Sequence, residues 1–216
     1  MGLPSGNRWA VSNLDAIGPY YFQETPFQYE CSFFSWGNVT PHNPISKAAF
    51  DYDFGGNNAA SPWYEGQPYG DTPGSTLTGD IPLNMDAARK MLGQPWLIPS
   101  IADYEELLAY TIFIDADGNE VDTTKSDKRV SVNGVMGIYI QSKLNGARMF
   151  FPCTGRGGGR SWVLSGISGY YWSRTYNSVR YARRLYFANT GVATARFEFR
   201  HFGFALRPLW KPSDLR

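Results

Sequence analysis

The sequence predicts a single domain of the mixed α+β class, with two short helices and a β-rich C-terminal half. Helix-capping residues flank two short segments between residues 84 and 111. From Val121 onward, short apolar and aromatic runs alternate with turn sequences, a pattern typical of antiparallel strands. The 216 residues are 43% hydrophobic and 16% aromatic and contain no evident repeat or linker, so we expect one sizeable core over residues 1–216.

The first 80 residues are expected to form loops and short strands. In the segment YYFQETPFQYECSFFSWGN, aromatic residues recur at short spacing, which suits strands packed on a core. Residues 51–80 are rich in Gly, Pro, Asn and Ser and predict a long inserted loop. Trp63, Tyr64 and Tyr69 would anchor that loop to the rest of the domain.

Two short helices are predicted next. The segment NMDAARKMLG begins at Asn84, the expected N-cap, and stops at Gly93. In PSIADYEELLAYT, Ser100 is the expected N-cap, and Asp103 three residues later completes a capping box. Helical spacing places four apolar side chains on the buried face of this second helix: Ile101, Tyr104, Leu107 and Leu108.

The C-terminal half is expected to contain a series of strands. VMGIYIQS and ARMFFP flank the turn KLNG and predict a hairpin. GRGGGRS, residues 155–161, predicts a flexible surface loop, because it lacks the GK[ST] ending of a phosphate-binding loop. Further strands are expected in GYYWSRT, RRLYFA, ATARFEFR and FGFALRPLW, with turns at NTG and near His201–Gly203.

The sequence offers few candidates for catalysis or metal binding. Cys31 and Cys153 are expected to be small buried residues, and whether they pair stays open. His42 and His201 lack the spacing of metal ligands, and no Ser-His-Asp signature accompanies them. DADGNEVD begins like a calcium loop but lacks the later ligands, so a hairpin turn at Asp117–Gly118 is favoured. We therefore expect no catalytic residue, no metal and no cofactor.

Positive charge is concentrated near the C-terminus, although the formal net charge is only +1. Residues 174–201 contain six arginines against one acidic residue, Glu198, a local balance of +5. No lysine lies among them, whereas six lysines lie elsewhere in the chain. A phosphate-binding strip would use lysine as freely as arginine, so a nucleic-acid surface is disfavoured. Arginine and tyrosine are instead typical of binding hot spots.

The segment VATARFEFRH, residues 192–201, leaves two interpretations open. Alternation along a strand places Arg196, Glu198 and Arg200 on one face and the aromatic side chains at 197, 199 and 201 on the other. In one interpretation this is an amphipathic strand whose aromatic face is buried. In the other it is part of a surface that binds a ligand.

A series of short motifs follows along the chain: GLPSGNRWAVSNLDA, FSWGN, PWLIPSIADYEELL, VNGVMGIYI, MFFPCTG, GYYWSRT and GFALRP. Their order resembles bacterial and phage domains with the C-type lectin fold, in the formylglycine-generating-enzyme-like and Fibrobacter major paralogous domain group. The resemblance covers most of the chain outside residues 51–79. The C-terminal part, residues 172–210, is similar to the variable region of a diversity-generating retroelement protein.

The resemblance implies that asparagine codons in this region are randomised at their adenines. Such codons can give Arg, Tyr, Phe, Ser, His, Ala or Val, but not Lys, Gln, Met, Trp or Glu. Residues 174–201 contain none of the first four excluded types, and Glu198 is the exception for the fifth. Randomisation would therefore account for arginine without lysine.

The resemblance also implies a rigid scaffold that presents an exposed, tolerant ligand surface. The scaffold would bury Trp172, Leu185, Phe187, Gly203, Phe204 and Leu206. The ligand-binding candidates are the arginine, aromatic and histidine side chains around it: Arg174, Tyr176, Arg180, Tyr181, Arg183, Arg184, Tyr186, Arg196, Phe197, Phe199, Arg200 and His201. The cysteine motif of formylglycine-generating enzymes and the EPN, QPD and WND motifs of calcium-dependent lectins are missing, which argues against catalysis and against a calcium site.

We therefore expect a non-catalytic ligand-binding protein, either a receptor-binding protein at a phage tail tip or a bacterial surface adhesin. Its partner would be a protein or carbohydrate receptor on a cell surface, bound without nucleic acid and without membrane insertion, and a homotrimer would suit a tail-fibre tip. No signal peptide and no run of ~18 apolar residues is visible, which favours the phage virion over the bacterial surface. The alternatives are an enzyme of the formylglycine-generating-like group and, less favoured, an Arg-rich nucleic-acid binder.

Overall fold

The computed structural model describes residues 1–15, 22–41, 77–122, 124–158 and 161–212. These residues form a β-rich α+β fold, as the sequence predicts. Most of the loop predicted at residues 51–80, including its three aromatic anchors, lies outside the described residues, as does His42. The elements are β1 (Arg8–Trp9), η4 (Leu83–Met85), α2 (Ala87–Leu92), β2 (Trp96–Leu97), α3 (Ile101–Ala109), β3 (Thr111–Phe113), β4 (Val130–Val132), β5 (Val135–Ser142), β6 (Arg148–Pro152), β7 (Arg156–Gly158), β8 (Ser161–Val163), β9 (Gly169–Tyr176), β10 (Tyr181–Ala188), β11 (Gly191–Phe199) and β12 (Leu209–Trp210).

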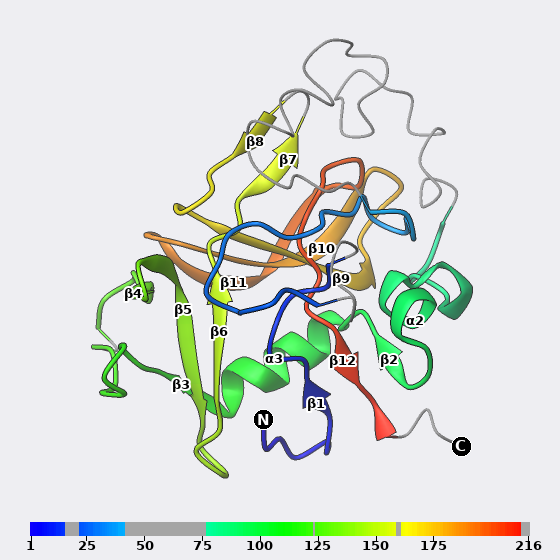
Figure 1. The fold of residues 1–216 in the computed structure, drawn as a ribbon. Coiled ribbons are helices and arrows are strands. Elements are labelled where there is room, and N and C mark those ends of the chain that lie inside the picture. The colour runs from blue at the N-terminus through cyan, green and yellow to red at the C-terminus, as the bar shows by residue number, and fades with distance from the viewer. Residues whose placement is uncertain (16–21, 42–76, 123, 159–160, 213–216) are drawn as a thin grey trace.

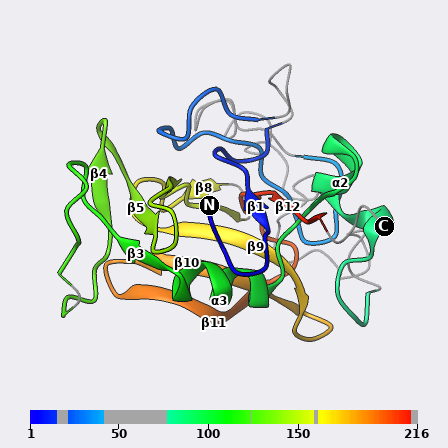
Figure 2. The ribbon, with the colours of Figure 1, turned by 90° about the horizontal axis from the view of Figure 1, so that it is seen from below.

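The strands form several antiparallel sheets. One sheet has the order β11–β10–β9, and another joins β3, β5 and β4, with β6 paired to β5. Helix α3 packs across one face of the β11–β10–β9 sheet (Figure 1 and Figure 2). In a third sheet β12 lies between β1 and β2, with Arg8 opposite Trp210, so strands from the two ends of the sequence lie side by side (Figure 1).

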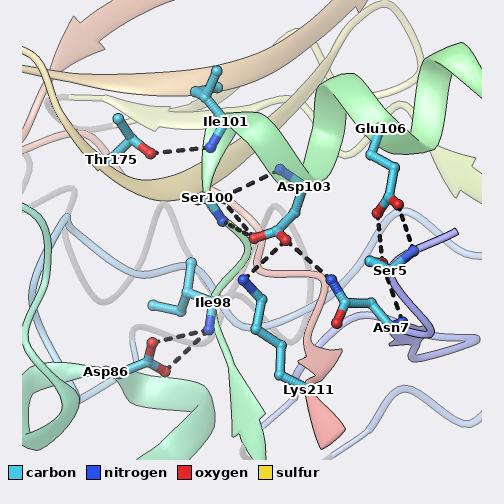
Figure 3. A network of polar contacts seen from close by, with 10 residues as sticks. All are labelled: Ser5, Asn7, Asp86, Ile98, Ser100, Ile101, Asp103, Glu106, Thr175 and Lys211. Atoms are coloured by element: carbon cyan, nitrogen blue, oxygen red, sulfur yellow. Dashed lines mark hydrogen bonds and ion pairs between the residues drawn. The ribbon is translucent and has the colours of Figure 1, made fainter. Parts of the chain in front are cut away.

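Helix α2 begins later than the sequence predicts. Asn84 lies in the short 3-10 helix η4, and Asp86 is the N-cap, whose Oδ1 accepts the amide of Arg89 at 3.0 Å. The same carboxylate accepts the amide of Ile98 at 2.9 Å and so also holds the chain beyond the helix (Figure 3). The helix ends at Gly93, as predicted, where a φ of 77° favours glycine.

Burial raises the pKa of Asp86, although its backbone hydrogen bonds oppose the shift. A carboxyl group whose pKa is higher in the folded protein than in the unfolded chain binds its proton more tightly when folded. Its contribution to stability therefore falls as the pH rises from the ordinary value of 3.8 through the raised pKa. We expect the free energy of unfolding of the wild-type protein, measured by urea denaturation relative to Asp86→Asn, to decrease across this window. A difference that grows with pH would contradict the raised pKa.

Helix α3 confirms its prediction. Ser100 Oγ accepts the amide of Asp103 at 3.2 Å, and Asp103 Oδ2 accepts the amide of Ser100 at 2.7 Å, which completes the capping box. Asp103 also pairs with Lys211 Nζ at 2.9 Å and accepts Nδ2 of Asn7 at 3.2 Å (Figure 3). The start of the helix is thereby tied to the residues just before β1 and just after β12. Leu108 is half-buried, and the other three predicted apolar side chains are buried.

The hairpin and the turn predicted between residues 113 and 152 are both confirmed. Strands β5 and β6 pair in antiparallel register, with Ile138 opposite Phe151. Asp115 Oδ1 accepts the amides of Asp117 at 3.0 Å and Asn119 at 2.8 Å, which closes a tight turn before the chain returns. Its oxygen atoms are therefore committed to the turn.

The glycine-rich segment after Cys153 is not the loop that the sequence predicts. Its described residues form β7 and β8, which pair with Gly157 opposite Trp162. Gly157 also pairs with Gly203, far along the sequence, through hydrogen bonds of 2.8 and 3.0 Å. Glycine fits here because two backbones meet with no side chain between them. The pairing with Gly203 orders this segment, and the sequence of the segment itself gives no sign of that pairing.

Apolar side chains form two clusters, one on each face of strands β9 and β10. The first contains residues of α3 and β5 together with Tyr171, Leu185 and Phe187. The second contains Trp36, Tyr170, Trp172, Ala182 and Phe204. All the predicted scaffold residues are buried, including Gly203: Trp172, Leu185, Phe187, Gly203, Phe204 and Leu206.

The two cysteines are buried and do not form a disulfide with each other. Burial raises the pKa of Cys153 to about 12 and also raises the pKa of Cys31, so both remain thiols at neutral pH. Across the part of the chain that the structure describes, no three His, Cys, Asp or Glu side chains are placed to hold a metal ion. No helix in the same residues has the length and apolar character needed to cross a membrane.

Arg207 is a fully buried charged residue that joins distant parts of the chain. Its Nε donates to Asn13 Oδ1 at 2.9 Å, and its Nη2 donates to the carbonyl of Phe150 at 2.9 Å. Its Nη1 donates to the carbonyls of Ala10, at 3.3 Å, and Val11. Burial lowers the pKa of the guanidinium, but an arginine remains charged at neutral pH. One guanidinium therefore joins the N-terminal segment and β6 to the chain just before β12.

Candidate functional site

The candidate ligand residues lie on the β11–β10–β9 sheet and directly after its strands, but they occupy both of its faces. Side chains along a strand alternate between faces. Leu185 and Phe187 pack in the same cluster as α3, whereas Tyr186 packs in the other cluster with Tyr170. We call the first the helix face; on β10 it carries Tyr181, Arg183, Leu185 and Phe187. The opposite face carries Ala182, Arg184 and Tyr186.

Three aromatic side chains at the start of β10 and the end of β11 form a partly exposed cluster, the aromatic patch: Tyr181, Phe197 and Phe199. Tyr181 is opposite Phe199 in the register, and their ring centroids lie 4.7 Å apart. The ring of Phe197 meets Tyr181 edge-on at 5.2 Å and is 51% exposed. Arg183, which is half-buried, lies directly opposite Phe197. The patch thus combines exposed ring area with a neighbouring guanidinium on a paired backbone.

The interpretation of residues 192–201 as a strand with a buried aromatic face is wrong. Phe197 is among the most exposed large apolar side chains of the described residues, whereas Arg200 is 1% exposed. Strand β11 is at the edge of its sheet, paired with β10 on one side, so a side chain at position 197 has few neighbours to cover it. Both faces change from exposed at Arg196 and Phe197 to buried at Arg200 and His201, so burial follows the position along the segment rather than the alternation of side chains.

Arg200 and His201 are buried, so their predicted exposure is wrong. The Arg200 guanidinium lies 4.5 Å from the ring centroid of Trp36 and 4.8 Å from that of Tyr176. It also donates to the carbonyl of Leu77 at 2.9 Å. This hydrogen bond holds the segment that leads to Ile81, which is hydrogen-bonded to β9. The ring of His201 packs against Phe202, with centroids 4.7 Å apart. Both side chains stabilise the scaffold around the end of β11.

Arg184 is also buried, which contradicts its predicted exposure. Its guanidinium lies 4.8 Å from the ring centroid of Tyr170 and 4.6 Å from that of Tyr186 on the opposite face. Its Nη2 is 3.5 Å from Oε2 of Glu198. The guanidinium thus packs against aromatic rings at the border of the second apolar cluster.

The remaining candidates differ in how far they reach solvent. Arg180 and Arg196 are exposed. Arg174 and Tyr176 are half-buried at the end of β9, where Nη2 of Arg174 donates to the carbonyl of Ile81 and the amide of Tyr176 donates to Asp80. These two residues are held by the segment before α2. The accessible candidates therefore centre on the hairpin of β10 and β11.

The sequence did not identify two residues that contact the candidates. Tyr170 contacts Arg184 and also a second arginine, Arg156, whose guanidinium is 5.8 Å from the ring centroid of Tyr170. The guanidinium of Arg156 also lies 4.2 Å from the ring centroid of Phe202. Arg156 is part of the glycine-rich segment that was predicted to be a loop. An arginine flanked by glycines was the available signal, but its position depends on the pairing of Gly157 with Gly203.

The groups that this part of the described structure exposes differ in chemistry from those that it buries. The thiols of both cysteines are buried and protonated, and the imidazole of His201 packs among aromatic rings. The accessible groups are phenyl and phenol rings and guanidinium groups, which bind by contact area and directional hydrogen bonds. When the chain was compared with models of protein families, with curated proteins and with solved structures, no match was found.

Proposed function

We propose that this protein is a non-catalytic ligand-binding protein with a C-type lectin-like fold, and that the hairpin of β10 and β11 meets the ligand. The observation that carries the proposal is the aromatic patch beside Arg183. Phe197 exposes 51% of its surface, although apolar side chains of the neighbouring strand β10 are fully buried. Exposed aromatic rings next to arginine are typical of the centre of protein interfaces.

The scaffold beneath the patch supports this proposal. Strand β10 is paired on both sides, and its helix-face residues Leu185 and Phe187 are fully buried. The exposed side chains of β10 and β11 can therefore be substituted without disturbing the core. Rings on a paired backbone also lose little conformational entropy when a ligand binds, which favours affinity.

The composition of the segment suggests how the surface varies. The arginine, tyrosine and phenylalanine residues, with no lysine, agree with randomised asparagine codons across residues 174–201, with Glu198 as the exception. The buried positions Arg184, Arg200 and His201 fall within the same range, and they would be the least tolerant of change. A genomic test follows: a reverse transcriptase gene and a near-identical repeat with mismatches at adenines should lie nearby. If no such repeat is present, the proposal of diversification fails.

We place the protein at a cell surface contact, as the receptor-binding tip of a phage tail or as a bacterial surface adhesin. The ligand would be a protein or carbohydrate receptor, and three copies would suit a tail tip. Two short helices followed by antiparallel strands are the order expected of the C-type lectin-like fold.

Replacing Phe197 with alanine is expected to reduce binding while leaving the fold intact. The side chain is half exposed, so the free energy of unfolding should fall by about 1 kcal/mol or less. Binding should be measured with the labelled protein on intact bacterial cells and on a glycan array. Leu144→Ala is the matched control, because Leu144 is 57% exposed in the turn between β5 and β6. Equal binding by the two variants would remove the aromatic patch from the ligand surface.

A further inference from the structure

Two arginines lie close to the ring of Tyr170 on the opposite face of the sheet. Arg184 on β10 lies 4.8 Å from the ring centroid, and Arg156 on β7 lies 5.8 Å from it. The side chain of Arg184 is only 9% exposed, whereas Arg156 is half-buried. We call these two residues the arginine pair. They come from separate hairpins, so the pair exists only in the folded protein.

The arginine pair has donor groups that the described residues do not satisfy. Nε and Nη1 of Arg184 and Nε of Arg156 are buried and have no hydrogen-bond partner there. A buried N–H donor without a partner is unfavourable, because it has lost its hydrogen bonds to water and gained none in return. Stacking on the rings of Tyr170 and Tyr186 compensates in part. Hydrogen-bonding capacity therefore remains at the pair.

The charge at this position is also unbalanced. Glu198 is the carboxylate that pairs with Arg184, and the contact of 3.5 Å is at the outer limit of a hydrogen bond. Burial lowers the pKa of Arg184, and the positive charge of Arg156 lowers it further. Two guanidinium groups and one carboxylate leave a net charge of +1. A group that brings one negative charge would neutralise it.

We propose that the arginine pair binds a carboxylate group of the ligand, beside Tyr170 and Tyr186. A planar, singly charged carboxylate matches the donor fork of a guanidinium and balances the remaining charge, whereas a phosphate dianion would leave an excess of negative charge. Arg156 is half-buried, and so are Tyr186 and Glu198, which both contact Arg184, so solvent reaches the surroundings of the pair. That the carboxylate belongs to a cell-surface receptor rests on the proposed function, but its binding to the pair does not.

The direct test is a titration with sodium acetate, followed by NMR of the arginine Nε–Hε groups in labelled protein. Ionic strength is held constant with sodium chloride, and acetamide serves as the neutral probe of the same shape. The Nε–Hε resonances of Arg184 and Arg156 are expected to shift and to saturate with acetate, but not with acetamide. Inorganic phosphate should bind more weakly than acetate. Absence of saturable shifts at Arg184 would overturn the proposal, and stronger binding of phosphate would overturn the choice of carboxylate.

Two variants locate the acetate. Arg156→Gln keeps a polar side chain at a half-buried position and should weaken acetate binding about tenfold, since it removes a charge-assisted hydrogen bond. Arg148→Gln is the control, because Arg148 is exposed on β6 and donates to Gln141 at 2.8 Å. Circular dichroism and urea denaturation establish that each variant is folded. Wild-type affinity in Arg156→Gln would contradict the proposal even if acetate binds elsewhere.

These measurements separate this proposal from the proposed function. If acetate binds at the pair but Phe197→Ala and Arg156→Gln attach to cells as the wild type does, the carboxylate site stands and the receptor function fails. If Phe197→Ala loses attachment while acetate produces no shift at Arg184, the receptor function stands and the carboxylate site fails.

Discussion

Replacing Arg207 with methionine is expected to lower the free energy of unfolding by about 4 kcal/mol. Methionine fills a similar length but offers no donor, so the side chain of Asn13 and the carbonyls of Ala10, Val11 and Phe150 all lose the hydrogen bond that Arg207 donates. Each buried acceptor left without a donor costs roughly 1 kcal/mol or more, and relief from burying a charge offsets only part of this sum. Urea denaturation followed by tryptophan fluorescence measures the change.

Arg148→Met is the matched control for Arg207→Met, since it makes the same chemical change at an exposed position. It should change stability by no more than about 0.5 kcal/mol. Arg207→Lys is expected to lie between the two, because an ammonium keeps the charge but cannot reach all four acceptors. Similar stabilities for Arg207→Met and Arg148→Met would show that the buried hydrogen bonds contribute little.

Replacing Gly155 with alanine is expected to cost about 3 kcal/mol or more. Its φ of 69° is unfavourable for a residue with a Cβ atom. A Cβ at this position would also lie 2.3 Å from the carbonyl oxygen of Val163 and 2.5 Å from the amide nitrogen of Ser165. Both are backbone atoms, so the β7–β8 hairpin would have to shift, and Arg156, the next residue, would shift with it.

Gly146→Ala separates the two causes. Gly146 has nearly the same φ, 71°, but no atom lies within 4 Å of the Cβ that alanine would add. Its cost should be the conformational one alone, about 1 kcal/mol. Thermal unfolding of both variants gives the difference, which measures the steric contribution at Gly155. Equal midpoints would mean that the hairpin accommodates a methyl group without loss.

The sequence predicted those elements whose signals are local. The capping box of Ser100 and Asp103 lies within four residues, and the turn between β5 and β6 lies between the strands that it joins. Helix α2 was misplaced because Asn84 and Asp86 are equally good N-caps by type. The amide of Ile98 selects Asp86, and it lies 12 residues away.

The candidate site was predicted by composition but not by exposure. The six scaffold positions are buried as expected, since their apolar side chains fit the core. Arg184 and Arg200 were assigned to the ligand surface because arginine is typical of binding hot spots, although both are buried. Rings of Tyr170, Tyr186 and Trp36, from other parts of the chain, supply the surroundings that allow it. Long-range aromatic partners of this kind leave no trace in the pattern of a single strand.

The position of β12 between β1 and β2 sets the order in which the protein can fold. Arg8 must wait for Trp210, and Asn13 must wait for Arg207, so neither contact can form until the C-terminal strand has left the ribosome. The hairpin of β10 and β11 is synthesised before that closure. Arg207 and β12 therefore close the fold late, after the hairpin that carries the aromatic patch has been synthesised.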